Sequence, residues 1–452
     1  MKKLFTIALA FLPINFLFSQ EKTDKLLVDI LSKQPDKFGK ILKNGKDLRV
    51  QIIYTQINRD AQNRPSFTSY NYRVNKDEYF YPASTVKFPA SLLALEKLNG
   101  LRINGLDKHS PMLTDSCEGI PNYPPQYLDD TKADNIPSVA HYVKKILMVS
   151  DNDAHNRLYE FMGQELFNKN LYLKGYKNVR IVHRLQNPMS REQNRRSNPI
   201  RFYNAAAKQA ESIDTVTQID PISYVTKTKI IVNKGFQDKD LVYAQPTLTS
   251  ATWFEAPQKI GVGKGFMRND QVVNEPFDFT TKNYYALEDQ QAVLRAALFP
   301  ESIAPEKRFN LTDDDYRFVW KYMSQLPTES TYPPYAKDTA MYDSYCKFLM
   351  FGDNKKPMPK NIRIFNKVGD AYGFLLDNAY IVDFDKGVEF MLSAIIYCNS
   401  DGIFNDDKYD YDKVGYPFMA NLGKTIYDYE VKRVKKIKPD LSKFKFEYDL
   451  KR

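Results

Sequence analysis

The run YFYPASTVKFPASLLALEKL at residues 79–98 decides the fold of this chain. After Ser84, apolar residues recur at spacings of three and four, which predicts a helix from Ser84 to about Leu98. Asn99-Gly100 follow and predict the end of that helix. Residues three apart on a helix face the same way, so the helix start brings the Ser84 hydroxyl near the Lys87 amine. A partly desolvated Lys can release its proton and serve as the base for a serine nucleophile.

Two further short motifs follow, Ser150-Asp151-Asn152 and Lys367-Val368-Gly369. Each motif is unspecific alone, because Ser-x-x-Lys recurs at Ser344–Lys347 and Ser442–Lys445, and Lys-x-Gly also recurs. Ser, Asp and Asn are moreover ordinary helix N-caps. Order and context separate the candidates. Only Ser84 follows a pair of expected strands, opens a long helix and precedes both other motifs.

The ordered set resembles the active site of the penicillin-recognising serine hydrolases, the class A β-lactamases and penicillin-binding proteins. The resemblance implies that Ser84 is the nucleophile, Lys87 its base and Ser150 a proton relay. Lys367 would supply positive potential beside them. No cofactor and no metal ion are expected, since the chain has only four His and no Cys/His cluster.

The same resemblance assigns three substrate-binding residues. Asn152 would hold the substrate backbone through its amide. Gly369 would let the backbone approach the substrate closely. Asp370 would donate its backbone N–H, together with that of Ser84, to form an oxyanion hole.

Three residues depart from the family pattern. Gln186, in Arg184-Leu185-Gln186, stands where class A β-lactamases carry the Glu that activates the deacylating water. An amide can hold a water but cannot take its proton, so slow deacylation is expected. Val368 replaces a hydroxyl residue, and Asp370 adds an acidic group beside the expected anion site. These two changes lead to the hypothesis that the substrate carries an amine near the scissile bond.

The expected fold class is α+β, with a β-lactamase/transpeptidase-like antiparallel sheet of about five strands built from both termini and packed on a helical block. Strand-like runs at 48–58, 67–74, 377–383 and 388–398 support it, as do helical patterns at 138–149, 283–298 and 312–325. Residues 20–452 are expected to form one domain. A block at about 188–276, where class A enzymes have a short loop, is interpreted as an insertion.

Residues 1–19 predict a secretory signal peptide, with Lys2 and Lys3 before an apolar stretch, hence an exported, periplasmic or secreted protein without a transmembrane anchor after cleavage. Three cysteines, Cys117, Cys346 and Cys398, leave open one bridge or three free thiols. The net charge of +10 is partly concentrated at 432–452. In an exported chain this basic tail favours solvent or anionic envelope polymers over nucleic acid.

The leading interpretation is a serine hydrolase acylated at Ser84 by a β-lactam or a peptide amide carbonyl. A cell-wall peptidase acting on D-Ala-D-Ala-type peptides would use the same residues on a peptidoglycan-like substrate. A non-catalytic envelope-binding or sensor protein on the same fold is the third interpretation.

Overall fold

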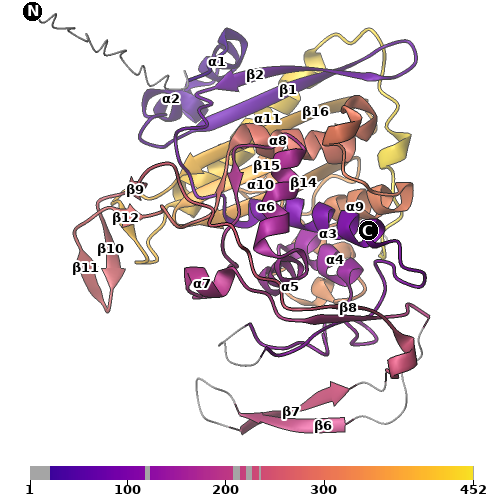
Figure 1. Cartoon of the computed structure of the whole chain (residues 1–452). Coiled ribbons are helices and arrows are strands. Elements are labelled where there is room, and N and C mark those ends of the chain that lie inside the picture. Colours follow the sequence, from indigo (N-terminus) through magenta and orange to yellow (C-terminus); the bar gives the residue numbers. More distant parts are fainter. Residues whose placement is uncertain (1–20, 118–122, 207–213, 220–225, 234–235, 451–452) are drawn as a thin grey trace, which may run out of the picture.

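The central feature of the protein is a five-stranded antiparallel sheet built from both ends of the chain. A computed structural model describes residues 21–117, 123–206, 214–219, 226–233 and 236–450; the expected signal peptide at 1–19 lies outside this range. The strands run in the order β14-β15-β16-β1-β2, and Figure 1 shows the N-terminal hairpin alongside the C-terminal strands. Their bounds are β1 Gln51–Arg59, β2 Pro65–Tyr72, β14 Ile362–Ala371, β15 Phe374–Asp383 and β16 Val388–Tyr397. The predicted fold class is therefore confirmed.

The burial of the strands follows their place in the sheet. All ten residues of β15 and all ten of β16 are buried, because helices cover both faces of the sheet at these central strands. In the outer strand β2 every residue but Tyr72 is exposed or part-buried. Between β14 and β15, Tyr372 and Gly373 have φ of 53° and 75°, the two left-handed residues of a tight hairpin turn.

Helices form one layer on each face of the sheet. One core joins Tyr380 and Met391 of the sheet to Leu92 and Val143 of the helical block. A second core joins Tyr54 and the opposite face to the terminal helices. The block contains α3 Lys87–Leu101, α4 Val139–Val149, α5 Asn152–Met162, α6 Gln164–Leu173, α8 Leu287–Leu298 and α9 Asp313–Ser324, while α1 Lys25–Ser32, α2 Pro35–Lys43, α10 Phe348–Phe351 and α11 Tyr416–Lys432 cover the other face.

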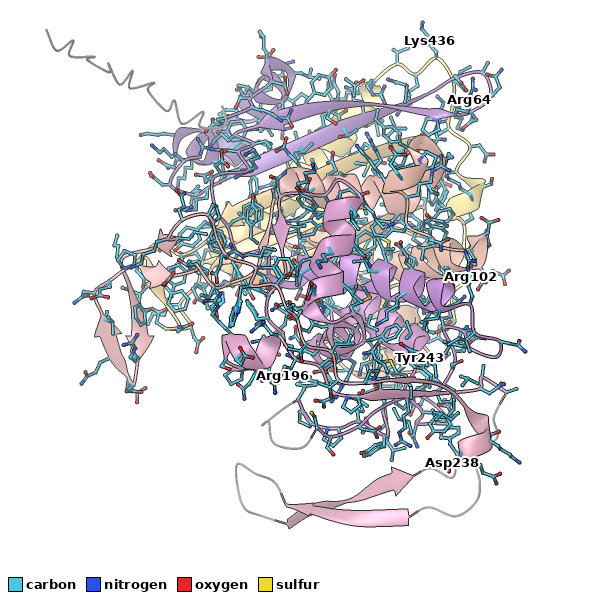
Figure 2. All side chains as sticks on the ribbon, in the orientation of Figure 1. Arg64, Arg102, Arg196, Asp238, Tyr243 and Lys436 are labelled. Carbon is cyan, nitrogen blue, oxygen red and sulfur yellow. The ribbon has the colours of Figure 1, made fainter. Side chains whose placement is uncertain are left out.

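The end of helix α3 differs from the prediction. Asn99 and Gly100 lie inside the helix, which continues to Leu101 and stops because Arg102 adopts a left-handed conformation (φ 53°, ψ 37°). Figure 2 labels Arg102, which is exposed at this end of the helical block. The helix start is also irregular, since Ala83–Val86 form a 3₁₀ turn before α3. The expected helix at 283–298 begins only at Leu287, after a short strand, β13 Tyr284–Tyr285.

The block at 188–276 is attached to the rest of the protein through short strands. β5 pairs with β3 and β8, so one part joins the helical block, and β10 pairs with β17 near the C-terminus. The interpretation of this block as an insertion within one domain stays a prediction. The short strands are β3 Met112–Thr114, β4 Val179–Arg180, β5 Ile200–Tyr203, β6 Asp214–Ile219, β7 Thr226–Asn233, β8 Leu241–Gln245, β9 Gly261–Val262, β10 Gly265–Arg268, β11 Gln271–Val273, β12 Phe277–Asp278 and β17 Ile403–Phe404.

The cysteines and the basic tail are also placed by the structure. Cys346 and Cys398 are buried thiols that form no disulfide within the described residues. The tail packs against the β1–β2 turn, where the Asn63 amide donates to the Lys438 carbonyl at 3.1 Å. Figure 2 shows the labelled Arg64 and Lys436 at the same end of the sheet.

Candidate active site

Ser84 lies in a strained turn at the mouth of a cleft. It belongs to the 3₁₀ turn Ala83–Val86, in which the Pro82 carbonyl accepts hydrogen bonds from the Thr85 amide (3.1 Å) and hydroxyl (2.7 Å). Ala83, directly before Ser84, has φ 46°, a left-handed conformation in a residue with a side chain. Such a residue costs about 1–3 kcal/mol and persists only where its surroundings enforce it. The turn therefore holds the Ser84 backbone in one position.

Lys87 and Lys367 meet at the Ser150 hydroxyl. The Lys87 ammonium donates to the Ser150 carbonyl and lies 3.3 Å from the Ser150 Oγ. The Lys367 ammonium donates to the same Oγ at 2.7 Å and to the Val368 carbonyl at 2.9 Å. Ser150 ends helix α4 in a left-handed conformation (φ 61°), which turns its side chain toward both lysines. Because the oxygen accepts from the lysines, the hydroxyl proton can be donated elsewhere.

The two lysines differ in how readily they lose a proton. Lys87 is fully buried, and this burial, followed by the charge of Lys367, holds the pKa of Lys87 well below its usual value. Burial also lowers the pKa of Lys367, to about 8. At neutral pH Lys367 therefore keeps its positive charge, while Lys87 is the lysine that most readily becomes a neutral base.

Gly369 and Asp370 lie on the open edge of the sheet, next to Ser84. A Cβ on Gly369 would lie 2.9 Å from the Pro82 carbonyl oxygen and 3.0 Å from the Ser84 nitrogen, so a side chain there would push the Ser84 turn away. Ala371 faces Phe374 across the two-residue turn, and the backbones of these two residues form a hydrogen-bonded pair. The N–H of Asp370 consequently points away from β15, toward the open edge of the outermost strand β14.

Asn152 and Gln186 both line the cleft and are hydrogen-bonded to each other. The Asn152 Nδ2 donates to the Gln186 Oε1 at 2.7 Å. Asn152 is the first residue of helix α5, and its neighbour Asp151 caps that helix by accepting from the Ala154 amide at 2.7 Å. The amide side chain of Gln186 thus lies next to the residue expected to hold the substrate backbone.

The loop that carries Gln186 is anchored by a buried ion pair. Arg184 pairs with Glu160, and both side chains are at most 1% exposed. Asn156 donates to the Leu185 carbonyl and accepts from the Leu185 amide, each at 2.9 Å. The sequence analysis named neither Glu160 nor Asn156. Asn156 lies one helical turn after Asn152 and Glu160 lies two turns after it, so all three share one face of helix α5. This spacing was the signal that could have identified them.

The cleft at Ser84 has a volume of about 380 Å³. One of its walls comes from residues that carry no motif and that the sequence analysis missed, in the loop after β17. Among the residues that the structure describes, it is lined by Tyr81, Ala83, Ser84, Asn152, Leu185, Gln186, Asp370, Ala371, Tyr372, Asn405, Asp407 and Tyr409. Ser84, Asn152, Gln186 and Asp370 therefore share one cleft, with Lys87, Ser150 and Lys367 joined to one another by hydrogen bonds.

Within the described ranges, no three His, Cys, Asp or Glu side chains are grouped so as to hold a metal ion. None of the helices in those ranges combines the length and the apolar character needed to cross a membrane.

Comparison with known proteins agrees with the motifs. Residues 20–221 match the sequence pattern of the Beta-lactamase enzyme family. Two of the three motifs, at Ser84–Lys87 and at Ser150–Asn152, lie inside the matched part. The resemblance of this chain to the β-lactamase-like serine hydrolases is thereby confirmed. No curated protein matches the chain.

Several solved structures are similar to this chain. A class A β-lactamase from Clostridium kluyveri shares 15% identity over 89% of this chain and 98% of its own, with a TM-score of 0.44. A β-lactamase from Xanthomonas campestris shares 13% identity over 90% and 99%, with a TM-score of 0.43. The protein PBP-A shares 14% identity over 91% and 98%, also with a TM-score of 0.43.

Proposed function

We propose that the protein is an exported serine hydrolase that is acylated at Ser84 by a β-lactam or by a peptide amide carbonyl. The observation that carries the proposal is the Ser150 hydroxyl, which accepts hydrogen bonds from Lys367 at 2.7 Å and lies 3.3 Å from the Lys87 amine. A hydroxyl held between a charged and a readily deprotonated lysine suits the transfer of a proton. Export rests on the sequence of residues 1–19, and an intact N-terminus in the protein recovered from the producing cells would contradict it.

Acylation would use neutral Lys87 as the base. Lys87 takes the proton of the Ser84 hydroxyl as Oγ attacks the carbonyl carbon, and the oxyanion is held by the N–H groups of Ser84 and Asp370. The C–N bond then breaks. The leaving nitrogen takes the Ser150 proton, which Ser150 regains from protonated Lys87, so the base returns to its neutral state. The positive charge of Lys367 stabilises the negative charge that develops in this step.

Deacylation is the weak step of the proposed cycle. Gln186 can position a water but has no basic oxygen to remove its proton. The acyl-enzyme should therefore accumulate when a β-lactam is added.

Intact-mass measurement after incubation with penicillin tests this function. We expect a one-to-one adduct that persists, that is absent in Ser84→Ala and that forms more slowly in Lys87→Met. An unmodified wild-type mass would favour a non-catalytic binding protein. Fast Ser84-dependent hydrolysis of nitrocefin would contradict the expected slow deacylation, and release of D-Ala from a D-Ala-D-Ala peptide would favour the peptidase.

A further inference from the structure

The two walls of the Ser84 cleft are joined by one continuous stretch of the 188–276 block, residues 248–266. We infer that this stretch, called the strap below, fixes the width of the cleft and thereby determines which acyl side chains fit. The inference rests on the proposed function and assigns the specificity of the same site.

The first end of the strap holds the loop that follows Gln186. Ser250 accepts a hydrogen bond from the Arg195 side chain, and its own amide donates to the Arg195 carbonyl at 2.8 Å. The ring of Trp253 lies 3.8 Å from the Arg195 guanidinium and 4.9 Å from that of Arg191. Arg191 is only five residues after Gln186, so the strap is fixed to the wall that carries Gln186.

The other end of the strap holds the loop on the opposite wall. Lys264 donates its amide to the Gly402 carbonyl at 2.8 Å, and β10 then pairs in parallel with β17 through Gly265 and Phe266. The chain continues from β17 directly into the loop whose Asn405, Asp407 and Tyr409 line the cleft. Figure 1 shows α7 (Arg191–Asn194) and strands β9 and β10 on the same side of the molecule.

The contact at the second end is tight. Gly263 has φ 78°, and a Cβ there would lie 2.5 Å from the Phe404 ring and 2.6 Å from the Gly402 carbonyl oxygen. Phe404 itself is fully buried and packs on the rings of Phe277 and Phe279, with centroids 5.5 and 5.3 Å away. A side chain at position 263 must therefore displace the β17 loop, because the tightly packed ring of Phe404 cannot move aside to make room for it.

The middle of the strap is not part of either wall. Glu255 pairs with Arg191 at 2.5 Å and extends the first attachment, and β9 pairs with β12 just before the second. Between them Pro257, Gln258 and Lys259 are exposed, so the chain runs over the surface there. A tether fixed at both ends limits how far the two walls can separate. Loss of either attachment should admit bulkier acyl groups without altering Ser84, Lys87 or Ser150.

Acylation by two penicillins in strap variants tests the inference. Penicillin G is compared with a penicillin whose acyl side chain carries a bulky fluorophore, in the wild type, Gly263→Ala and Trp253→Ala. Val272→Ala, on the exposed strand β11, is the matched control. We expect the ratio of bulky to small acylation rate constants to rise at least fivefold in either strap variant and to stay within twofold in the control.

Hydrogen–deuterium exchange supplies a second readout that does not depend on acylation. Exchange should accelerate at residues 402–409 in Gly263→Ala and at 186–197 in Trp253→Ala. The exchange of the other segments and the melting temperature should stay as in the wild type. Unchanged exchange there, or an unchanged acylation ratio in the folded variants, would overturn the role of the strap. Failure of both penicillins to acylate the wild type would instead overturn the proposed function.

Discussion

Replacement of Gln186 by Glu should convert the slow deacylation into turnover. In the structure the Gln186 Oε1 accepts from Asn152 at 2.7 Å, and a Glu carboxylate can accept the same bond while its second oxygen takes a proton from water. Gln186 is exposed to the cleft, so burial adds little cost for the new charge. Its left-handed φ of 54° is as accessible to Glu as to Gln. A positioned general base contributes about 100- to 10,000-fold, equal to about 3–5 kcal/mol of barrier.

Nitrocefin hydrolysis under steady-state conditions measures this gain, and the pre-steady-state burst reports acylation separately. We expect Gln186→Glu to raise the deacylation rate constant by about 100-fold or more, with the burst rate changed less than threefold. Gln186→Met, which offers no carboxylate, should leave deacylation slow. A folded Gln186→Glu variant that accumulates acyl-enzyme as persistently as the wild type would refute the assignment of position 186.

Four further outcomes are expected. The acylation rate should fall above about pH 8 as Lys367, whose lowered pKa is about 8, loses its proton and its charge; in Lys367→Arg this alkaline decline should vanish from the pH–rate profile, since Arg stays protonated. Gly369→Ala should slow acylation about 100-fold with little change in melting temperature, because its Cβ displaces the nucleophile's turn. Arg184→Met leaves the Glu160 carboxylate buried without its partner, and urea denaturation should show a loss of about 3–5 kcal/mol that Arg184→Met/Glu160→Gln partly restores. Asp370→Ala should abolish any preference for ampicillin over penicillin G, two penicillins that differ by one amine; an equal preference in both proteins would rule out the amine hypothesis.

Local pattern predicted the hairpin β1–β2 and also the central strands β15 and β16, which are buried on both faces, and it failed where tertiary structure decides. The hairpin β1–β2 was recognisable because two strand-like runs flank a polar turn at residues 63–66. Asn99-Gly100 has the composition of a helix end, yet Gly100 lies in open space inside α3, and the left-handed residue is Arg102. Local preference favours Gly100 over Arg102 as the left-handed residue, since an Arg seldom adopts that conformation, so the sequence pointed to the wrong position.

The candidate site was predictable to the extent that it is carried by motifs. The interval after Ser150 placed Gln186 in the sequence, and the structure brings it to Asn152. The wall formed by Asn405, Asp407 and Tyr409 was not predictable, because contacts between parts of the chain far apart in sequence, such as the pairing of β17 with β10, bring it to the cleft. Such a contact depends on the three-dimensional path of the chain rather than on spacing.

The sheet order has a consequence for when the protein becomes reactive. Strand β1 pairs with β16, where Gln51 faces Ile395, and Lys367 reaches Ser150 only when β14 lies in the assembled sheet. Contacts between such distant parts of the chain form late, because closing a long loop costs entropy before any pairing repays it. During synthesis the ribosome must release nearly the whole polypeptide before the nucleophile, its base and the edge strand can meet. Under the proposed function, a nascent chain is therefore expected to be unreactive, and acylation of Ser84 would report completion of folding.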